Sequence, residues 1–255
     1  MSTPAPISPA APPMGRPGGR QLPPLHKAKV LQSIDAAHDM RRVTLALPEG
    51  TGFTYKPGQA VVLLIETGTE ERARRDYTIR AAEGDIITLD ILMHGETPGP
   101  LWAKNAKPGD EIEFRGPRGG TWLDPEADWH LITGDETVIP AIEHMLETAA
   151  PGAKIHVLLE IASAEKRFEI ETEADLTLNW VERAGAPAGP SDLMVDAVAA
   201  FVLPEGRGRL LLLGETSNVR RQRRLMLERG VSKSDIYSEG YWRPGRLGGH
   251  DHVDD

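Results

Sequence analysis

Hydrophobic residues recur with two different patterns along the chain, and the pattern changes near residue 118. Over 28–117 the apolar residues form short runs, some alternating and some continuous, separated by turn residues such as Gly58, Gly84 and Gly109. Regular short strands punctuated by turns are typical of a small antiparallel barrel. We therefore expect about six strands in this half. The clearest are at 41–47, 59–66, 76–82, 85–94 and 110–117.

Beyond residue 128, strand-like runs alternate with helical patterns, which predicts an α/β unit with a mostly parallel sheet. Strands are expected at 130–134, 154–162, 176–183, 209–214 and near 235–242. Helices are expected at 137–150, 191–202 and 217–229. The fold class is thus a two-domain chain, an N-terminal antiparallel β-barrel followed by an α/β domain. The domains are expected at 25–122 and 123–247, with disordered tails at 1–24 and 248–255.

Composition narrows the class of protein further. The first 24 residues are rich in Pro, Ala and Gly and lack the apolar block of a signal peptide. No apolar run reaches the ~18 residues of a membrane span. The net charge of −9 argues against nucleic acid and anionic membranes as partners. The absence of cysteine excludes disulfides, thiolate zinc and iron–sulfur clusters. We expect a monomeric, cytoplasmic protein.

Acidic turns follow two of the expected strands. Gly134 precedes Asp135, Glu136 and Thr137, where a dinucleotide-binding unit would usually carry glycines. Pro140 fits only the first turn of a helix, which makes Thr137 the expected cap and leaves both acids in an exposed turn.

The second turn repeats this order as Gly214, Glu215 and Thr216. Ligands of open α/β sheets bind beyond the carboxyl ends of the strands, so the two turns indicate one site. The alternative is that these residues only cap helices.

Three segments together resemble the siderophore-interacting proteins, which are flavin-dependent ferric-siderophore reductases related to ferredoxin–NADP reductases. The segments are RRDYTIR at 74–80, GDETVIPA at 134–141 and GYWRPG at 240–245. The resemblance covers roughly residues 26–246. It implies FAD in the barrel domain, NADPH or NADH in the α/β domain, and a ferric siderophore as substrate.

The resemblance implies flavin contacts from the first segment. Tyr77 would pack near the isoalloxazine, Thr78 would contact its polar edge, and Arg75 would serve the flavin or its phosphate. Strand alternation puts Arg75, Tyr77 and Ile79 on one face, and Asp76, Thr78 and Arg80 on the other. A strand with solvent-facing arginines is the alternative.

Residues 92–110 resemble the family's flavin phosphate loop, in which His94, Gly95, Gly99 and Pro100 match. The family usually has small residues, often including Ser, between GP and WA, whereas this chain has only Leu101. This shortening affects the expected phosphate contacts, and FAD affinity is the property most exposed to it. Backbone N–H groups ahead of a short helix would remain available.

The resemblance also places residues around the nicotinamide and the substrate. Asp135, Glu136, Thr137 and Glu215 would line the nicotinamide side of the crevice. Trp242 would approach the flavin or simply pack, and Arg243 and Arg246 would attract an anionic siderophore. The arginine-rich stretch 218–224 is either a phosphate site or a solvated helix face.

The expected reaction passes electrons from NAD(P)H through FAD to the ferric siderophore, which releases Fe(II). Flavins accept electrons in pairs and donate them singly, so the protein needs no catalytic side chain of its own. The alternatives are a general NAD(P)H-dependent flavin or ferric reductase, and a non-catalytic siderophore or flavin carrier with a decayed FAD loop.

Overall fold

The structure is a computed structural model that describes residues 22–246, 248 and 251–253. Its N-terminal half is a closed barrel with the strand order β1–β2–β5–β4–β3–β6, antiparallel throughout. The strands are β1 (Leu25–Ala36), β2 (Met40–Ala46), β3 (Ala60–Ile65), β4 (Ala73–Glu83), β5 (Ile86–Leu92) and β6 (Glu111–Arg118). The helix α1 (Pro98–Asn105) lies between β5 and β6 along the chain.

The second half holds a six-stranded sheet in the order β12–β11–β10–β7–β8–β9, parallel except for β12. Its strands are β7 (Trp129–Gly134), β8 (Lys154–Ile161), β9 (Asp175–Glu182), β10 (Gly208–Glu215), β11 (Ile236–Trp242) and β12 (Asp251–His252). The helices are α2 (Ile139–Glu147), α3 (Leu193–Ala200) and α4 (Thr216–Glu228). Three single 3₁₀ turns are η1 (Glu136–Val138), η2 (Ala164–Lys166) and η3 (Lys233–Asp235).

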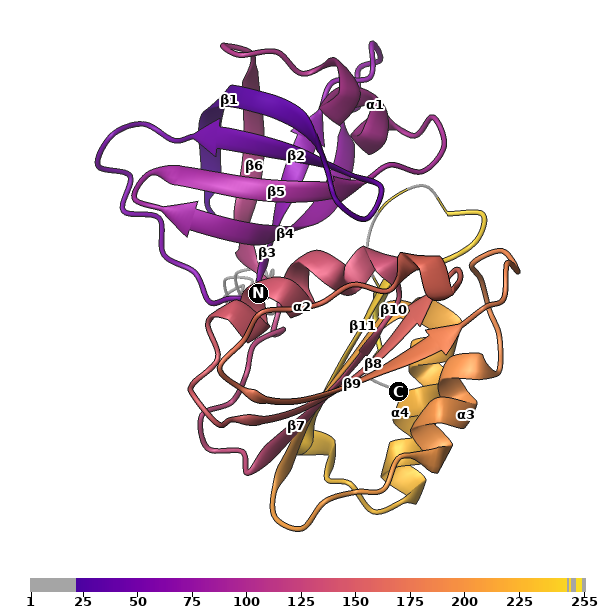
Figure 1. Cartoon of the computed structure of the whole chain (residues 1–255). Coiled ribbons are helices and arrows are strands. Elements are labelled where there is room, and N and C mark those ends of the chain that lie inside the picture. The colour runs from indigo at the N-terminus through magenta and orange to yellow at the C-terminus, as the bar shows by residue number, and fades with distance from the viewer. Residues whose placement is uncertain (1–21, 247, 249–250, 254–255) are drawn as a thin grey trace, which may run out of the picture.

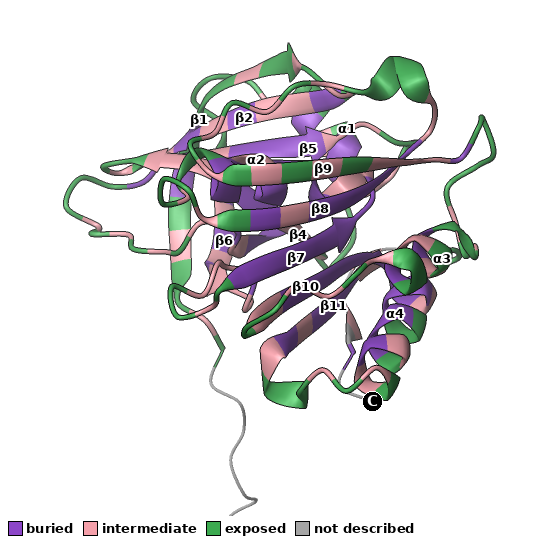
Figure 2. Ribbon diagram, turned by 60° about the horizontal axis from the view of Figure 1, so that its bottom comes forward, coloured by how far each residue is buried: buried purple, intermediate pink, exposed green. Residues whose placement is uncertain are grey.

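The central strands of the second half are continuous apolar runs because the parallel sheet is covered on both faces. Every residue of β7 is buried, whereas the edge strand β9 alternates between exposed and half-buried residues (Figure 2). Helix α2 lies between the barrel and the sheet, and α3 and α4 cover the opposite face of the sheet (Figure 1). The fold class expected from the sequence is therefore confirmed.

The two halves are joined through helix α2 and strand β4. Arg80 of β4 contacts Glu143 and Glu147 of α2 at 3.0 and 2.5 Å. The hydroxyl of Tyr55 lies 2.8 Å from Nε2 of His144, also in α2. These contacts fix the seam between barrel and sheet, where the functional site lies.

The chain ends of the structure differ from the expectation. Most of the tail expected at 1–24 lies outside the described residues. The tail expected at 248–255 is corrected for residues 251–253. Strand β12 pairs with β11, and Val253 is buried, with its carbonyl accepting a hydrogen bond from Ser238. Backbone pairing and a buried valine offset the low hydrophobicity that made this stretch look disordered.

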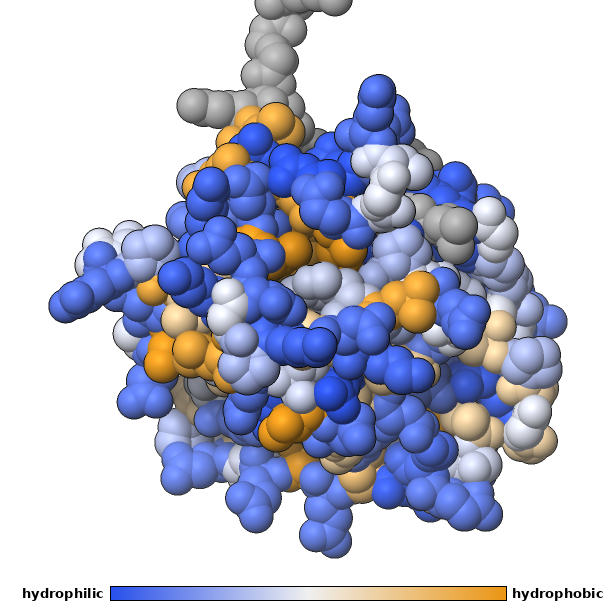
Figure 3. Space-filling model, turned by 90° about the horizontal axis from the view of Figure 1, so that it is seen from above, coloured by the Kyte–Doolittle hydropathy of each residue, from blue (hydrophilic) through white to orange (hydrophobic). Residues whose placement is uncertain are grey.

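The surface is mainly hydrophilic when the molecule is seen from above the barrel, and apolar residues are scattered among polar ones (Figure 3). Single exposed apolar residues are normal in soluble domains and need no partner to explain them. Within the part of the chain that the structure describes, no helix is long and apolar enough to cross a membrane.

Candidate functional site

A cavity of about 450 Å³ opens between the barrel and the sheet. One wall comes from the first half of β4 and the segment after β5, and the other comes from the turn after β7 and the end of β11. Most of the residues predicted from the sequence line it. These are Arg75, Tyr77, Thr78, His94, Asp135, Glu136, Thr137, Trp242, Arg243 and Arg246.

The barrel wall is built on consecutive residues of β4. Tyr77 packs against the barrel core and Ile79 is part of it, so the alternation expected for this strand is confirmed on that face. On the other face Asp76 and Arg80 form ion pairs. Arg75 donates to the carbonyl of Arg74 and has no carboxylate partner among the described residues. Arg75, Tyr77 and Thr78 all line the cavity, although alternation puts Thr78 on the other face of the strand, so a cation, an aromatic ring and a hydroxyl are available there.

The phosphate-loop residues divide into two groups. His94 and Thr97 line the cavity, whereas Gly95, Gly99 and Pro100 do not. Gly99 affects the cavity indirectly, by leaving space for Tyr77, because a Cβ on Gly99 would lie 1.7 Å from the tyrosine hydroxyl oxygen.

Leu101 does not disturb this loop. The residue is 40% exposed in α1, and its N–H donates to the carbonyl of Thr97. The shortened segment thus still folds as a helix that begins at the cavity. Pro98 and Pro100 have no N–H, so the first turn of this helix offers fewer backbone donors to an anion than an ordinary first turn does.

The turn after β7 differs from the expected arrangement. Asp135, not Thr137, caps the helical segment, because its Oδ1 accepts from the N–H of Thr137 at 3.0 Å and from its hydroxyl at 2.5 Å. Asp135 is also buried rather than exposed, and its Oδ2 accepts from the indole N–H of Trp242 at 2.8 Å. Burial raises the pKa of Asp135 above its usual range. The 3₁₀ turn η1 moves the start of α2 beyond Thr137.

Trp242 is thereby fixed against the sheet edge by Asp135. Arg243 and Arg246, expected to attract the substrate, are both paired with Asp251 of β12. Their positive charge is thus partly compensated within the chain. Sequence reasoning did not include Tyr241, which lines the same cavity next to Trp242 and carries a pKa raised by burial. Its place in the segment GYWRPG was the available signal.

The second acidic turn has a structural role. Glu215 caps α4, and its Oε2 accepts from the N–H groups of Ser217 and Asn218, each at 2.9 Å, and from the hydroxyl of Ser217. Glu215 does not line the cavity. The prediction that it contacts the cofactor therefore has no support from this geometry, and the capping alternative describes Glu215 better.

Replacing Glu215 with alanine is expected to lower the free energy of unfolding by about 2 kcal/mol, because a buried cap with three donors is lost. Urea unfolding followed by circular dichroism measures this. Glu228→Ala, an exposed substitution at the other end of α4, is the control and should change stability by less than about 0.5 kcal/mol. Equal effects of the two substitutions would contradict the assignment.

A largely buried network of ion pairs adjoins the cavity, which Asp76 also lines. Arg118 of β6 donates to Asp76 of β4 at 2.6 Å and to Glu239 of β11 at 3.2 Å. Tyr237 donates to the second oxygen of Glu239 at 2.6 Å. Because Asp76 and Glu239 belong to different domains, Arg118 joins barrel and sheet beside the cavity.

Comparisons with known proteins fit this architecture. Residues 127–245 match the model of the siderophore-interacting protein family, and residues 67–121 match the siderophore-interacting FAD-binding domain. The chain belongs to the siderophore-interacting protein family. The expected family is thus confirmed, and the match of the barrel to an FAD-binding domain confirms FAD as the expected cofactor.

Individual relatives of this siderophore-interacting protein agree. The ferric vibriobactin reductase ViuB of Vibrio cholerae is 32% identical over 178 residues, which is 68% of this chain and 65% of ViuB. A siderophore utilization protein from T. fusca has the same fold, with a TM-score of 0.78 at 28% identity, over 91% of this chain and 98% of that chain. A ferredoxin NADP+ reductase from Neisseria gonorrhoeae shares the fold at 15% identity, with a TM-score of 0.58 over 86% and 99% of the two chains.

The cavity residues fit an FAD molecule. Arg75 and His94 would be the residues to hold a pyrophosphate, by charge and hydrogen bonds, and Tyr77 would be the aromatic surface for the ring system. Because Gly99 has no Cβ, helix α1 can lie directly against the hydroxyl end of the Tyr77 ring. These residues come from the barrel half, the half that matches the FAD-binding domain.

Proposed function

We propose that this protein is a reductase that passes electrons from NAD(P)H through FAD to a ferric siderophore and releases Fe(II). The observation that carries the proposal is that one cavity is lined both by residues of β4 suited to a flavin and by residues at the carboxyl ends of β7 and β11. Open parallel α/β domains bind nucleotides in the crevice outside the carboxyl ends of their strands. A donor bound there and a flavin bound on the barrel would share this space.

Each side chain then has a positioning role. Tyr77 and Thr78 orient the flavin, Arg75 and His94 bind its phosphates, and Glu136 and Thr137 face the donor. FAD, when bound, supplies the ability to take two electrons from a nicotinamide and release them singly. A siderophore holds Fe(III) with hard oxygen donors, so reduction weakens its hold on the iron.

His94 makes flavin affinity depend on pH. Burial, and then the charge of Arg75, lower the pKa of His94, so the imidazole is neutral at pH 7. A pyrophosphate beside it favours the protonated form, so binding takes up a proton. We therefore expect FAD to bind roughly fivefold more tightly at pH 5.5 than at pH 7.5.

Flavin fluorescence titration at the two pH values measures this dependence. In His94→Gln, which keeps a hydrogen-bonding side chain but cannot gain the charge, the ratio should fall close to one. An unchanged ratio in that variant would assign the pH dependence to another group.

The alternatives make different predictions for the substrate. A general ferric reductase would reduce ferric citrate and a ferric siderophore equally well, and a flavin reductase would need added free flavin. A carrier would bind FAD or siderophore without consuming NAD(P)H. The geometry favours the enzyme, because α1 and the residues that fit FAD are intact despite the shortened loop.

Steady-state reduction of a ferric siderophore, followed with a ferrous-iron chelator, tests the proposal. We expect NAD(P)H oxidation that depends on bound FAD and on the ferric siderophore, with ferric citrate a poorer substrate. Equal rates with both iron compounds would support the general reductase, and no NAD(P)H oxidation at full FAD occupancy would support the carrier.

A further inference from the structure

A second cavity adjoins the flavin cavity. It has a volume of about 760 Å³ and lies between the β1–β2 hairpin and the carboxyl end of β8. The two cavities share Met40, Leu92, His94, Glu136 and Ala188. Because the two cavities have lining residues in common and follow the carboxyl ends of β7 and β8, both lie within reach of one elongated ligand.

Two cationic side chains, Arg183 and Lys166, line the second cavity, and carboxylates compensate their charges to different extents. Arg183 is buried and held by Glu136 at 2.6 Å and by Glu160 at 3.1 Å, so two carboxylates already compensate it. Lys166 in η2 pairs only with Asp39, at 2.5 Å, among the described residues. The side chains of Lys166 and Asp39 are 46% and 64% exposed, and exposed pairs of this kind are weak. Lys166 is therefore the cation that an entering anion can engage.

The partner of Lys166 is held in place by the fold. His38 and Asp39 form the tip of the β1–β2 hairpin and have φ angles of 61° and 56°, which residues other than glycine rarely adopt. His38 lies against Phe168, with ring centroids 3.9 Å apart, and its Nε2 is 3.5 Å from Glu143. The hairpin tip of the barrel is thus docked on the α/β domain, which places the Asp39 carboxylate on Lys166 at the edge of the cavity.

We propose that the second cavity receives the adenosine half of NADPH and that Lys166 binds the additional phosphate on its ribose. Asp39 occupies the same lysine until the phosphate replaces it. This inference rests on the proposed function, because it assigns the donor of that reaction. It makes Lys166 the residue that selects NADPH over NADH, and it makes the barrel hairpin part of the nucleotide site.

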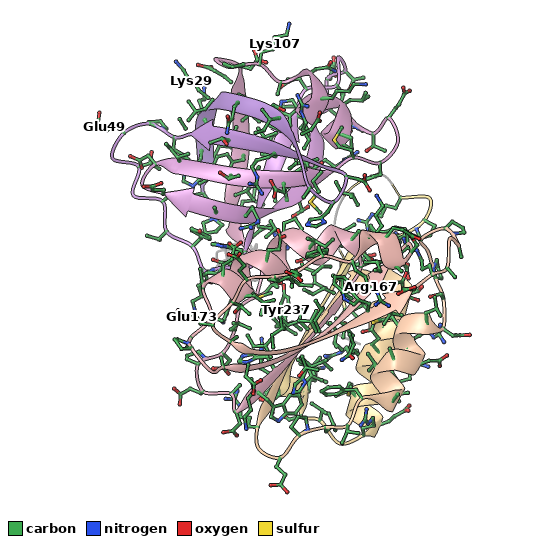
Figure 4. The ribbon with its side chains drawn as sticks, viewed as in Figure 1. Lys29, Glu49, Lys107, Arg167, Glu173 and Tyr237 are labelled. Atoms are coloured by element: carbon green, nitrogen blue, oxygen red, sulfur yellow. The ribbon has the colours of Figure 1, made fainter. Side chains whose placement is uncertain are left out.

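The arginines at 218–224 are less suitable for this role. None of them lines either cavity, and Arg221 pairs with Asp192 on the surface of the α/β domain. Arg167, next to Lys166, pairs with Glu182 and does not line the second cavity either (Figure 4 labels Arg167). Arg167 therefore serves as a matched control for the loss of one positive charge in the same segment.

Calorimetric binding of 2′,5′-ADP and of 5′-AMP to the FAD-loaded protein tests the inference, because the two probes differ only by the phosphate in question. We expect the wild type to prefer 2′,5′-ADP. Lys166→Gln should weaken the binding of 2′,5′-ADP roughly tenfold and leave the affinity for 5′-AMP unchanged. Asp39→Asn should raise the affinity for 2′,5′-ADP roughly two- to fivefold, since the competing carboxylate is gone. Arg167→Gln should change neither affinity.

Two results would overturn the inference. If Lys166→Gln weakens the binding of both probes equally, the lysine binds the phosphate that they share. If it weakens the binding of neither, the lysine is not a ligand. Reduction of bound FAD by NADPH and by NADH, measured in the same preparations, separates this from the proposed function. Reduction by either donor supports the proposed function whatever the calorimetry shows, and reduction by neither would contradict it.

Discussion

Gly99→Ala is expected to weaken FAD binding by about tenfold or more. The added Cβ would lie 1.7 Å from the hydroxyl oxygen and 3.0 Å from Cζ of Tyr77. The ring is packed against the barrel core and cannot yield without moving into the cavity or displacing α1. Overpacking of this kind costs about 1–3 kcal/mol, and here the cost falls on the surface that we propose to bind the flavin. Fluorescence titration of the apoprotein with FAD measures the change.

The contact can be separated from a general effect on the helix. Tyr77→Phe removes the hydroxyl but keeps the ring, so the double variant with Gly99→Ala should recover most of the lost affinity. Leu101→Ala, an exposed truncation in the same helix that does not line the cavity, should bind FAD like the wild type. A Gly99→Ala protein with wild-type affinity would show that Tyr77 does not shape the flavin site.

Arg118→Met is expected to lower the free energy of unfolding by about 3 kcal/mol or more. The substitution removes the cation shared by Asp76 and Glu239, whose side chains are only 19% and 5% exposed. Breaking a buried pair from one side is costly because charge stays behind in a poorly solvated place. Since the two acids belong to different domains, the loss should also loosen the seam beside the cavity. Urea unfolding at pH 7 measures it.

Two further variants test the cause. Adding Glu239→Gln to Arg118→Met removes one of the stranded charges and should recover part of the stability. Arg167→Met breaks a pair whose side chains are 53% and 29% exposed, so it should cost less than about 1 kcal/mol. If Arg118→Met and Arg167→Met cost the same, burial of the network would not explain its contribution.

The barrel and the parallel sheet could be predicted from the sequence because hydrophobic spacing is a local signal. Strand β4 is an example, since alternation alone assigned Tyr77 and Ile79 to one face and Asp76 and Arg80 to the other. The first strand, β1, did not stand out. Only Ala28 and Val30 of its twelve residues are buried, whereas its large apolar residues Leu25, Leu31 and Ile34 are exposed, so hydrophobic spacing gave the strand no clear inward face.

The roles of the acidic turns could not be read from the sequence. Asp135 and Glu215 occupy equivalent places after two strands, yet Asp135 lines the cavity and Glu215 does not. The difference comes from Trp242, which reaches Asp135 from a strand more than 100 residues away in the chain. The Asp39–Lys166 and Arg243–Asp251 pairs were missed for the same reason, because nothing local connects their partners.

We propose that FAD, its donor and its ferric acceptor meet at one cavity. An anaerobic absorption experiment on the FAD-loaded protein tests it most directly, with NADPH added first and a ferric siderophore second. NADPH is expected to bleach the flavin bands and the ferric siderophore to restore them, with two Fe(II) released for each flavin. Flavin bands that bleach but do not return on addition of the ferric siderophore would show that the reduced flavin does not pass its electrons to the iron.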